Sequence, residues 1–174
     1  EYTGISFCKA ERSMTILVIK IVWQISSLQN GKRTAERRSS VNQIVLTGMV
    51  LSTTPVGEYD RRVVLLTKEQ GKVSAFAKGS RRPNSPLVGV VNPFTFGEFT
   101  MYEGRSSYTI QSAKVINYFS ELREDVLGAY YGFYFLEIAN YYAREFNDEL
   151  EMLKLLYQTM RALTNPHIPN ALIR

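Results

Sequence analysis

The stretch RRVVLLTKEQGKVSAFAK, residues 61–78, predicts a β-hairpin. Its two halves, residues 61–67 and 72–78, each have the length of a strand. The connection KEQG is short and ends in glycine, which adopts turn conformations that other residues avoid. We therefore expect two paired strands here.

The two-residue period of a strand divides residues 72–78 between two faces. One face carries a hydroxyl, a ring and an ammonium group: Ser74, Phe76 and Lys78. The other carries small apolar side chains: Val73, Ala75 and Ala77. The first face suits a single-stranded nucleic acid, because cations bind phosphates and a ring stacks on a base. The alternative is that Phe76 belongs to the core and Lys78 only blocks an edge strand from pairing.

The segment AKGSRRPNSP, residues 77–86, cannot continue the strand. Proline donates no hydrogen bond to a neighbouring strand, and glycine has no side chain to pack. Lys78, Arg81 and Arg82 lie within five residues of one another, and a purely structural role explains such a group poorly. We predict a cationic loop that contacts phosphates.

Three further segments predict strands: NQIVLTGMVLS (42–52), FTFGEFTMY (94–102) and SYTIQSAKVI (107–116). We expect Gly48 to break the first of them, and the turn-rich stretch TTPVGEYD to follow it. The turn EGRS joins the last two in a second hairpin. Five strands with no helix among them predict a small antiparallel barrel, closed or partly closed.

After Asn117 the apolar period becomes helical. Ser120 is expected to cap a first helix, whose first turn holds acidic residues that suit the positive end of the helix dipole. Its expected apolar face is Leu122, Val126, Ala129, Phe133, Leu136 and Ala143. The aromatic stretch AYYGFYFLEIANYYAREF within it is expected to be buried between neighbours, with a peptide-binding groove as the alternative.

Asp148 and Glu151 resemble a capping box that starts a second helix. The stretch NALIR, residues 170–174, predicts the opening of a third. The expected fold class is therefore α+β in two segments, with the five-stranded antiparallel barrel at residues 41–117 and a truncated all-α domain at residues 118–174.

Cationic side chains are concentrated in the middle of this 174-residue chain. The formal net charge is +5, which favours an anionic partner. Residues 41–120 hold nine Lys and Arg against five Asp and Glu, whereas residues 121–174 hold five against eight. The distribution indicates two regions with different partners.

Residues 14–25, MTILVIKIVWQI, are apolar but too short to cross a bilayer, which takes about 20 such residues. A signal peptide is the alternative, although no cleavage pattern of small residues follows. We interpret residues 1–40 as a poorly defined leader or an upstream translated extension, outside the native domain, and expect no membrane partner.

The sequence lacks the residues that enzymes and metal sites commonly use. Cys8 is the only cysteine and His167 the only histidine, so no disulfide and no cluster of nitrogen and sulfur ligands can form within the chain. No phosphate-loop, zinc-protease or nucleophile-elbow motif is present. Glu58 and Asp60 are interpreted as charge partners of the two arginines that follow them. We expect a binding protein rather than an enzyme.

The stretch GEYDRRVVLLTKEQGKVSAFAKGSRRPNS (57–85), the PF that follows it at 93–94 and REDVLGAYYGFYFLEIANYY (123–142) resemble the RecO family of bacterial recombination mediators. The resemblance covers about residues 43–174 and is specific in order and spacing. It implies an oligonucleotide-binding (OB) barrel followed by a helical domain, in a cytoplasmic, nucleoid-associated DNA repair protein.

The resemblance also implies partners and site residues. Members of the family bind single- and double-stranded DNA, anneal strands coated by the single-strand-binding protein, and work with RecR to help load the RecA recombinase. It implies that Lys78, Arg81 and Arg82 form the DNA face, with Arg61, Arg62 and Lys72 as neighbours. The helical domain would receive the tail of the single-strand-binding protein. Many members carry a four-cysteine zinc site in sequence that would follow Arg174, so no cofactor is expected here.

One alternative function stays open. The barrel could serve as a protein-interaction module whose basic face binds an acidic peptide, because carboxylates and phosphates attract the same cations.

Overall fold

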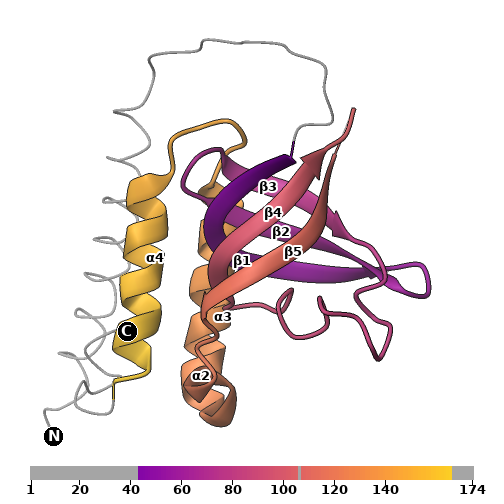
Figure 1. Ribbon diagram of the computed structural model, residues 1–174. Coiled ribbons are helices and arrows are strands. Elements are labelled where there is room, and N and C mark those ends of the chain that lie inside the picture. Colours follow the sequence, from indigo (N-terminus) through magenta and orange to yellow (C-terminus); the bar gives the residue numbers. More distant parts are fainter. Residues whose placement is uncertain (1–42, 106, 166–174) are drawn as a thin grey trace, which may run out of the picture.

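The computed structural model of the chain describes residues 43–105 and 107–165 (Figure 1). Five strands close a barrel in the order β1-β2-β3-β5-β4, and helices follow it. The strands are β1 (Gln43–Val56), β2 (Asp60–Thr67), β3 (Gly71–Ala77), β4 (Phe96–Glu103) and β5 (Tyr108–Asn117). The helices are α2 (Glu121–Glu124), α3 (Val126–Tyr142) and α4 (Leu150–Leu163). The expected barrel and the helical segment after it are confirmed.

One strand pair corrects the expectation of a wholly antiparallel barrel. β3 and β5 are parallel, with Ala75 beside Tyr108 and Phe76 beside Thr109, whereas the other four pairs are antiparallel. An odd number of strands in a closed ring cannot alternate direction throughout. The long β3–β4 loop, residues 78–95, makes this order possible because it carries the chain past β5 before β4 begins.

β1 is not broken at Gly48, contrary to the expectation, and it continues to Val56 through half of the predicted turn region. Gly48 pairs with Thr67 of β2 and with Gly97 of β4, so it lies where β1 passes from one neighbour to the other. A Cβ atom at this position would lie 2.3 Å from the Leu66 carbonyl oxygen. Glycine is therefore used here for close backbone approach rather than to end a strand.

Two hydrophobic cores divide the molecule. The first fills the barrel and includes Leu46, Val50, Val63, Leu65, Val73, Ala75, Ala77, Phe99 and Met101. The second lies between the barrel and the helices and includes Met49, Leu51, Leu66, Phe94, Phe119, Leu136, Leu153 and Met160. In Figure 1, α3 and α4 cover one side of the barrel, and the β1–β2 turn projects from the opposite side. The end of the barrel away from the helices is therefore the part that remains accessible to a ligand.

The first helix does not begin as expected. Ser120 has a helical backbone and makes no capping hydrogen bond, and α2 ends after four residues. Asp125 is the true cap, since its Oδ1 accepts from the Leu127 amide at 3.0 Å and α3 starts after it. A side chain oxygen placed two residues before a free amide stabilises the start of a helix.

The apolar face expected for the first helix is confirmed only in part: Leu122, Leu136 and Ala143 are buried. Val126 and Phe133 are exposed, whereas the buried positions within α3 are Gly128, Gly132, Leu136 and Ala139. A Cβ atom at Gly132 would lie 2.8 Å from the Phe94 ring, so small residues let the helix approach this ring. Consequently the aromatic side chains of α3 are largely turned outward, against the expectation that they are buried.

The second predicted helix is confirmed as α4. Asp148 Oδ1 accepts from the Leu150 amide at 3.1 Å, whereas Glu151 pairs with Lys154 at 2.7 Å instead of completing a capping box. The predicted leader (1–40) and third helix (170–174) lie outside the described residues. No helix in the described ranges is both long and apolar enough to span a bilayer.

Candidate nucleic-acid interface

Two loops are joined at the end of the barrel away from the helices. They are the β1–β2 turn, residues 57–59, and the start of the β3–β4 loop. The Arg81 amide donates to the Tyr59 carbonyl at 2.9 Å, and Arg81 Nη1 donates to the Gly57 carbonyl at 3.2 Å. The Gly79 amide donates to Asp60 Oδ1 at 2.7 Å. Gly79 has φ +65°, a conformation that strains other residues, so the loop can turn sharply here.

Five cations gather at this end, and we call them the basic rim: Arg61, Arg62, Lys78, Arg81 and Arg82. All but Arg61 are exposed. Arg62 Nε donates to Ser74 Oγ at 2.8 Å, and Arg61 Nη1 donates to Asn92 Oδ1 at 3.0 Å. In the described part of the chain, the one side-chain ion pair joins Glu151 and Lys154. The charges of the rim are thus not neutralised by carboxylate partners.

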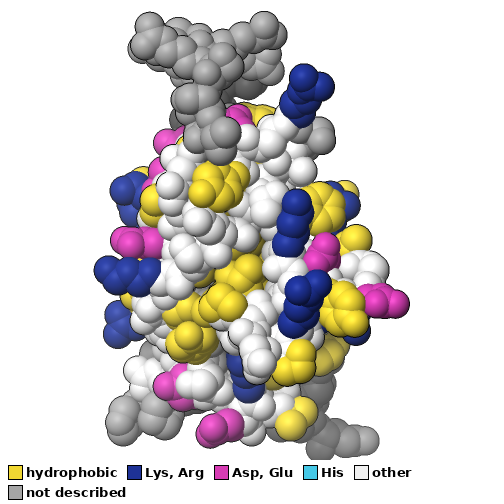
Figure 2. Space-filling view, turned by 45° about the vertical axis from the view of Figure 1, so that its right-hand side comes forward, with side chains coloured by type: hydrophobic (Ala, Val, Ile, Leu, Met, Phe, Trp, Pro, Cys, Tyr) yellow, Lys and Arg dark blue, Asp and Glu magenta, His cyan; other side chains and the backbone are white. Residues whose placement is uncertain are grey.

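The outer face of β3 agrees with the prediction. Val73, Ala75 and Ala77 are buried in the barrel core. Phe76 is half-buried and belongs to neither core, so the alternative of a core position does not hold. Across the strand pair it lies opposite Arg62. Figure 2 shows cationic and exposed hydrophobic side chains beside one another on the right of the molecule.

Lys72 is the one predicted site residue that lies elsewhere. Its Nζ donates to the Asn140 carbonyl at 3.0 Å, and its amide donates to the Arg144 carbonyl at 2.9 Å. An ammonium group at the carbonyl end of a helix is favourable. Lys72 and Lys78 are six residues apart, roughly 20 Å along an extended strand. The structure therefore assigns Lys72 to the contact between β3 and α3.

Two residues of the candidate interface, Tyr59 and Asp60, were not predicted from the sequence. Tyr59 is 49% exposed at the turn, and Arg82 Cζ lies 5.0 Å from the centre of its ring. Asp60 was interpreted as a charge partner of the arginines, but its carboxylate holds the Gly79 amide instead. The signal available for Tyr59 was a lone aromatic side chain in a turn of otherwise polar residues and glycine.

Among the described residues, no metal site is found at this end of the barrel. The described ranges contain no group of three or more His, Cys, Asp or Glu that could hold a metal ion. Burial and the nearby Glu103 carboxylate raise the pKa of Tyr108. Its phenol donates to Gln70 Oε1 at 2.9 Å.

Comparisons with known proteins identify the barrel. Residues 41–119 match the family "Recombination protein O N terminal". A DNA repair protein RecO from Alkaliphilus metalliredigens is 36% identical over 121 residues, which cover 70% of this chain and 49% of the relative. Proteins of the same name from Acetivibrio thermocellus and Bacillus cereus are 32% and 31% identical, over 71% and 72% of this chain.

The chain spans about half the length of these relatives. The match includes the whole barrel, both loops of the interface and the basic rim. Residues 41–119 therefore carry the N-terminal domain of the RecO family.

Proposed function

We propose that the chain acts in DNA repair by recombination and that its basic rim binds the phosphates of DNA. The observation that carries the proposal is the set of five cations without a carboxylate partner at one end of an OB barrel. Four of the five are arginines, whose planar guanidinium groups bind phosphate oxygens in pairs. The names of the matched relatives support DNA repair as the setting.

Strand annealing is the activity that such a surface supports. Two complementary strands held against positive charge repel each other less and reach a high local concentration. Base pairing then supplies the driving force, and no bond-making side chain is required. In this proposal the protein anneals strands coated by the single-strand-binding protein and, with RecR, assists loading of the RecA recombinase.

The helical segment is the proposed site for the tail of the single-strand-binding protein. Exposed rings on α3 support this assignment, because an acidic tail that ends in phenylalanine needs apolar contacts. These rings are Tyr130, Phe133, Tyr134 and Tyr141, whose exposed fractions are 72%, 51%, 48% and 80%.

A double substitution, Arg81→Ala with Arg82→Ala, tests the rim. Removing one cation that binds a phosphate should flatten the salt dependence for a single strand by about 0.7 in log–log slope. Removing two such cations therefore predicts that the drop in affinity between 50 and 200 mM salt becomes roughly sevenfold smaller. Fluorescence anisotropy with a labelled oligothymidine measures both the affinity and the slope.

The matched control is Lys154→Ala with Arg161→Ala, which removes two cations from α4. It should leave affinity and slope unchanged, because α4 lies on the far side of the barrel in Figure 1. Equal behaviour of the two double mutants would contradict the proposal. Titration with oligonucleotides of increasing length tests the acidic-peptide alternative, since a nucleic-acid groove should show a site size of several nucleotides.

A further inference from the structure

We propose that Tyr59 stacks on an unpaired base and gives the basic rim a preference for single-stranded over duplex DNA. This inference rests on the proposed function, and it adds the form of DNA that is recognised. It follows from the position of the ring, from its arginine neighbour and from the hydrogen bonds that hold the turn.

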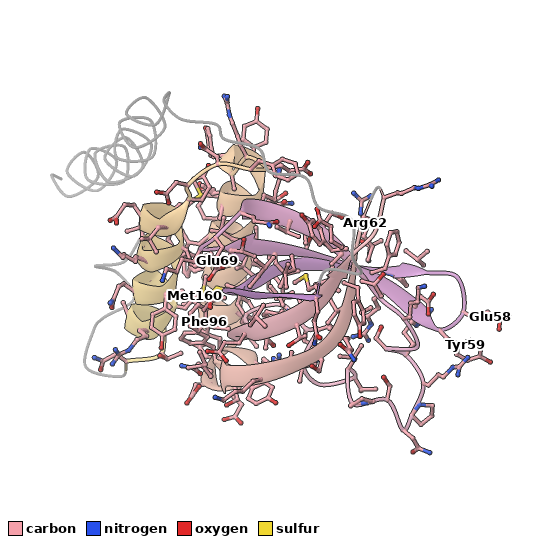
Figure 3. The ribbon with its side chains drawn as sticks, turned by 45° about the horizontal axis from the view of Figure 1, so that its top comes forward. Glu58, Tyr59, Arg62, Glu69, Phe96 and Met160 are labelled. Atoms are coloured by element: carbon pink, nitrogen blue, oxygen red, sulfur yellow. The ribbon has the colours of Figure 1, made fainter. Side chains whose placement is uncertain are left out.

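The ring of Tyr59 is presented rather than buried. It lies at the β1–β2 turn, which projects from the barrel, and Figure 3 shows Glu58 and Tyr59 at its tip. About half of the residue is exposed, with 49% of its surface accessible, although Arg82 lies 5.0 Å from the ring centre. An arginine beside an exposed ring offers a phosphate contact and a base contact at neighbouring positions.

A structural role does not account for the ring. The turn and the cationic loop are already joined by three hydrogen bonds, from the Arg81 amide, from Arg81 Nη1 and from the Gly79 amide. None of these bonds uses the Tyr59 side chain. The ring is therefore not needed to join the loops, and its backbone stays fixed by the carbonyl that accepts from Arg81.

Phe76 gives the surface a second ring with its own arginine. It faces outward on β3 and lies opposite Arg62, as Tyr59 lies beside Arg82. Cations alone would favour duplex DNA, whose charge density is higher. Rings reverse this order, because the faces of the bases are hidden in a duplex and open in a single strand.

The test compares Tyr59→Ala and Tyr59→Phe with the unmodified chain on three labelled probes. The probes are oligothymidine, a duplex of equal length, and an abasic strand that keeps the phosphates but lacks bases. Tyr59→Ala should weaken binding of oligothymidine roughly 5- to 100-fold, the range expected for one stacked base. Its affinity for the duplex and for the abasic strand should stay within about twofold of the affinity of the unmodified chain. Tyr59→Phe should bind all three probes like the unmodified chain.

Any other result contradicts either the stacking role of Tyr59 or the proposed function. Equal losses on oligothymidine and on the abasic strand would mean that Tyr59 acts by positioning Arg82, which overturns the inference. Unchanged binding of oligothymidine by Tyr59→Ala, with normal binding by the unmodified chain, overturns it as well and leaves the proposed function standing. If the unmodified chain binds none of the probes at 50 mM salt, the proposed function itself fails. Thermal unfolding of each variant confirms that the fold is retained.

Discussion

Asp60 places a negative charge within the basic rim, where it has two opposing effects. Its charge repels the phosphates that the neighbouring cations would bind. Its Oδ1 atom also accepts from the Gly79 amide at 2.7 Å and so holds the loop that carries Lys78, Arg81 and Arg82. Hydrogen bonds to charged groups are worth about 1.5–3 kcal/mol, so the second effect is large enough to dominate.

Two substitutions at this position separate the effects. Asp60→Asn keeps an oxygen acceptor and removes the charge, so affinity for a single strand should rise about two- to fivefold. Asp60→Ala removes the acceptor as well, so its affinity should fall below that of Asp60→Asn even though both have the same charge. Anisotropy titrations at one salt concentration measure the order.

Glu58→Gln is the control for charge alone, because the exposed Glu58 carboxylate makes no contact with the loop among those described. It should raise affinity by about the same factor as Asp60→Asn. An Asp60→Ala variant that binds as tightly as Asp60→Asn would show that the Gly79 contact does not organise the rim.

The residues that sequence could and could not assign differ in one physical respect. Lys78, Arg81 and Arg82 lie in a segment rich in glycine, proline and charge, and local pattern alone predicts that they are exposed. Lys72 has the same strand parity as Lys78, yet it meets the end of α3. Which end of a strand a later helix will cover depends on tertiary packing, and the strand's own sequence does not contain this information.

At the level of single elements, we expect Lys72 to contribute to stability rather than to DNA binding. Lys72→Met keeps the aliphatic stem and removes the ammonium group that donates to the Asn140 carbonyl. The free energy of unfolding should fall by about 1 kcal/mol. The salt slope of DNA binding should stay the same, and urea denaturation together with anisotropy measures the two outcomes. A flatter salt dependence of DNA binding in Lys72→Met would instead show that Lys72 contacts DNA.

β1 depends on close approach at Gly48. Gly48→Ala would place a methyl group 2.3 Å from the Leu66 carbonyl oxygen, and backbone atoms cannot move aside as a flexible side chain does. We expect the free energy of unfolding to fall by about 2–3 kcal/mol. Urea denaturation measures the change.

Gly89→Ala is the matched control, because a Cβ atom there would meet nothing within 4 Å. Its effect should stay within about 0.5 kcal/mol. Similar changes in the free energy of unfolding for the two variants would mean that the barrel can relax around Gly48. The close approach of β1 to its neighbours would then not be essential.

The β2–β3 hairpin was predictable from local pattern, whereas the full buried face of α3, which depends on packing, was not. The β2–β3 hairpin follows from two strand-length runs and a turn that ends in glycine, all within 18 residues of sequence. The buried face of α3 is formed by Gly128, Gly132 and Ala139 around Leu136. Glycine gives no hydrophobic signal, so a search for large apolar side chains selects Val126 and Phe133, which are exposed.

At the scale of the whole molecule, the two cores give the barrel two different sides. One side is covered by α3 and α4 through a shared hydrophobic cluster, and the opposite end keeps its loops and cations accessible. Under the proposed function, the helices therefore limit which part of the barrel is open to DNA, although they lie far from the rim. Charge follows the same division, since the region after residue 120 has more Asp and Glu than Lys and Arg.

We propose that DNA contacts the barrel at the basic rim and its two joined loops. Titrating the isotope-labelled chain with a short oligothymidine, and following its amide chemical shifts, locates this contact. The largest changes should occur at residues 57–62 and 76–82, with little change along α4. Changes confined to the helices, or none at 50 mM salt, would contradict it.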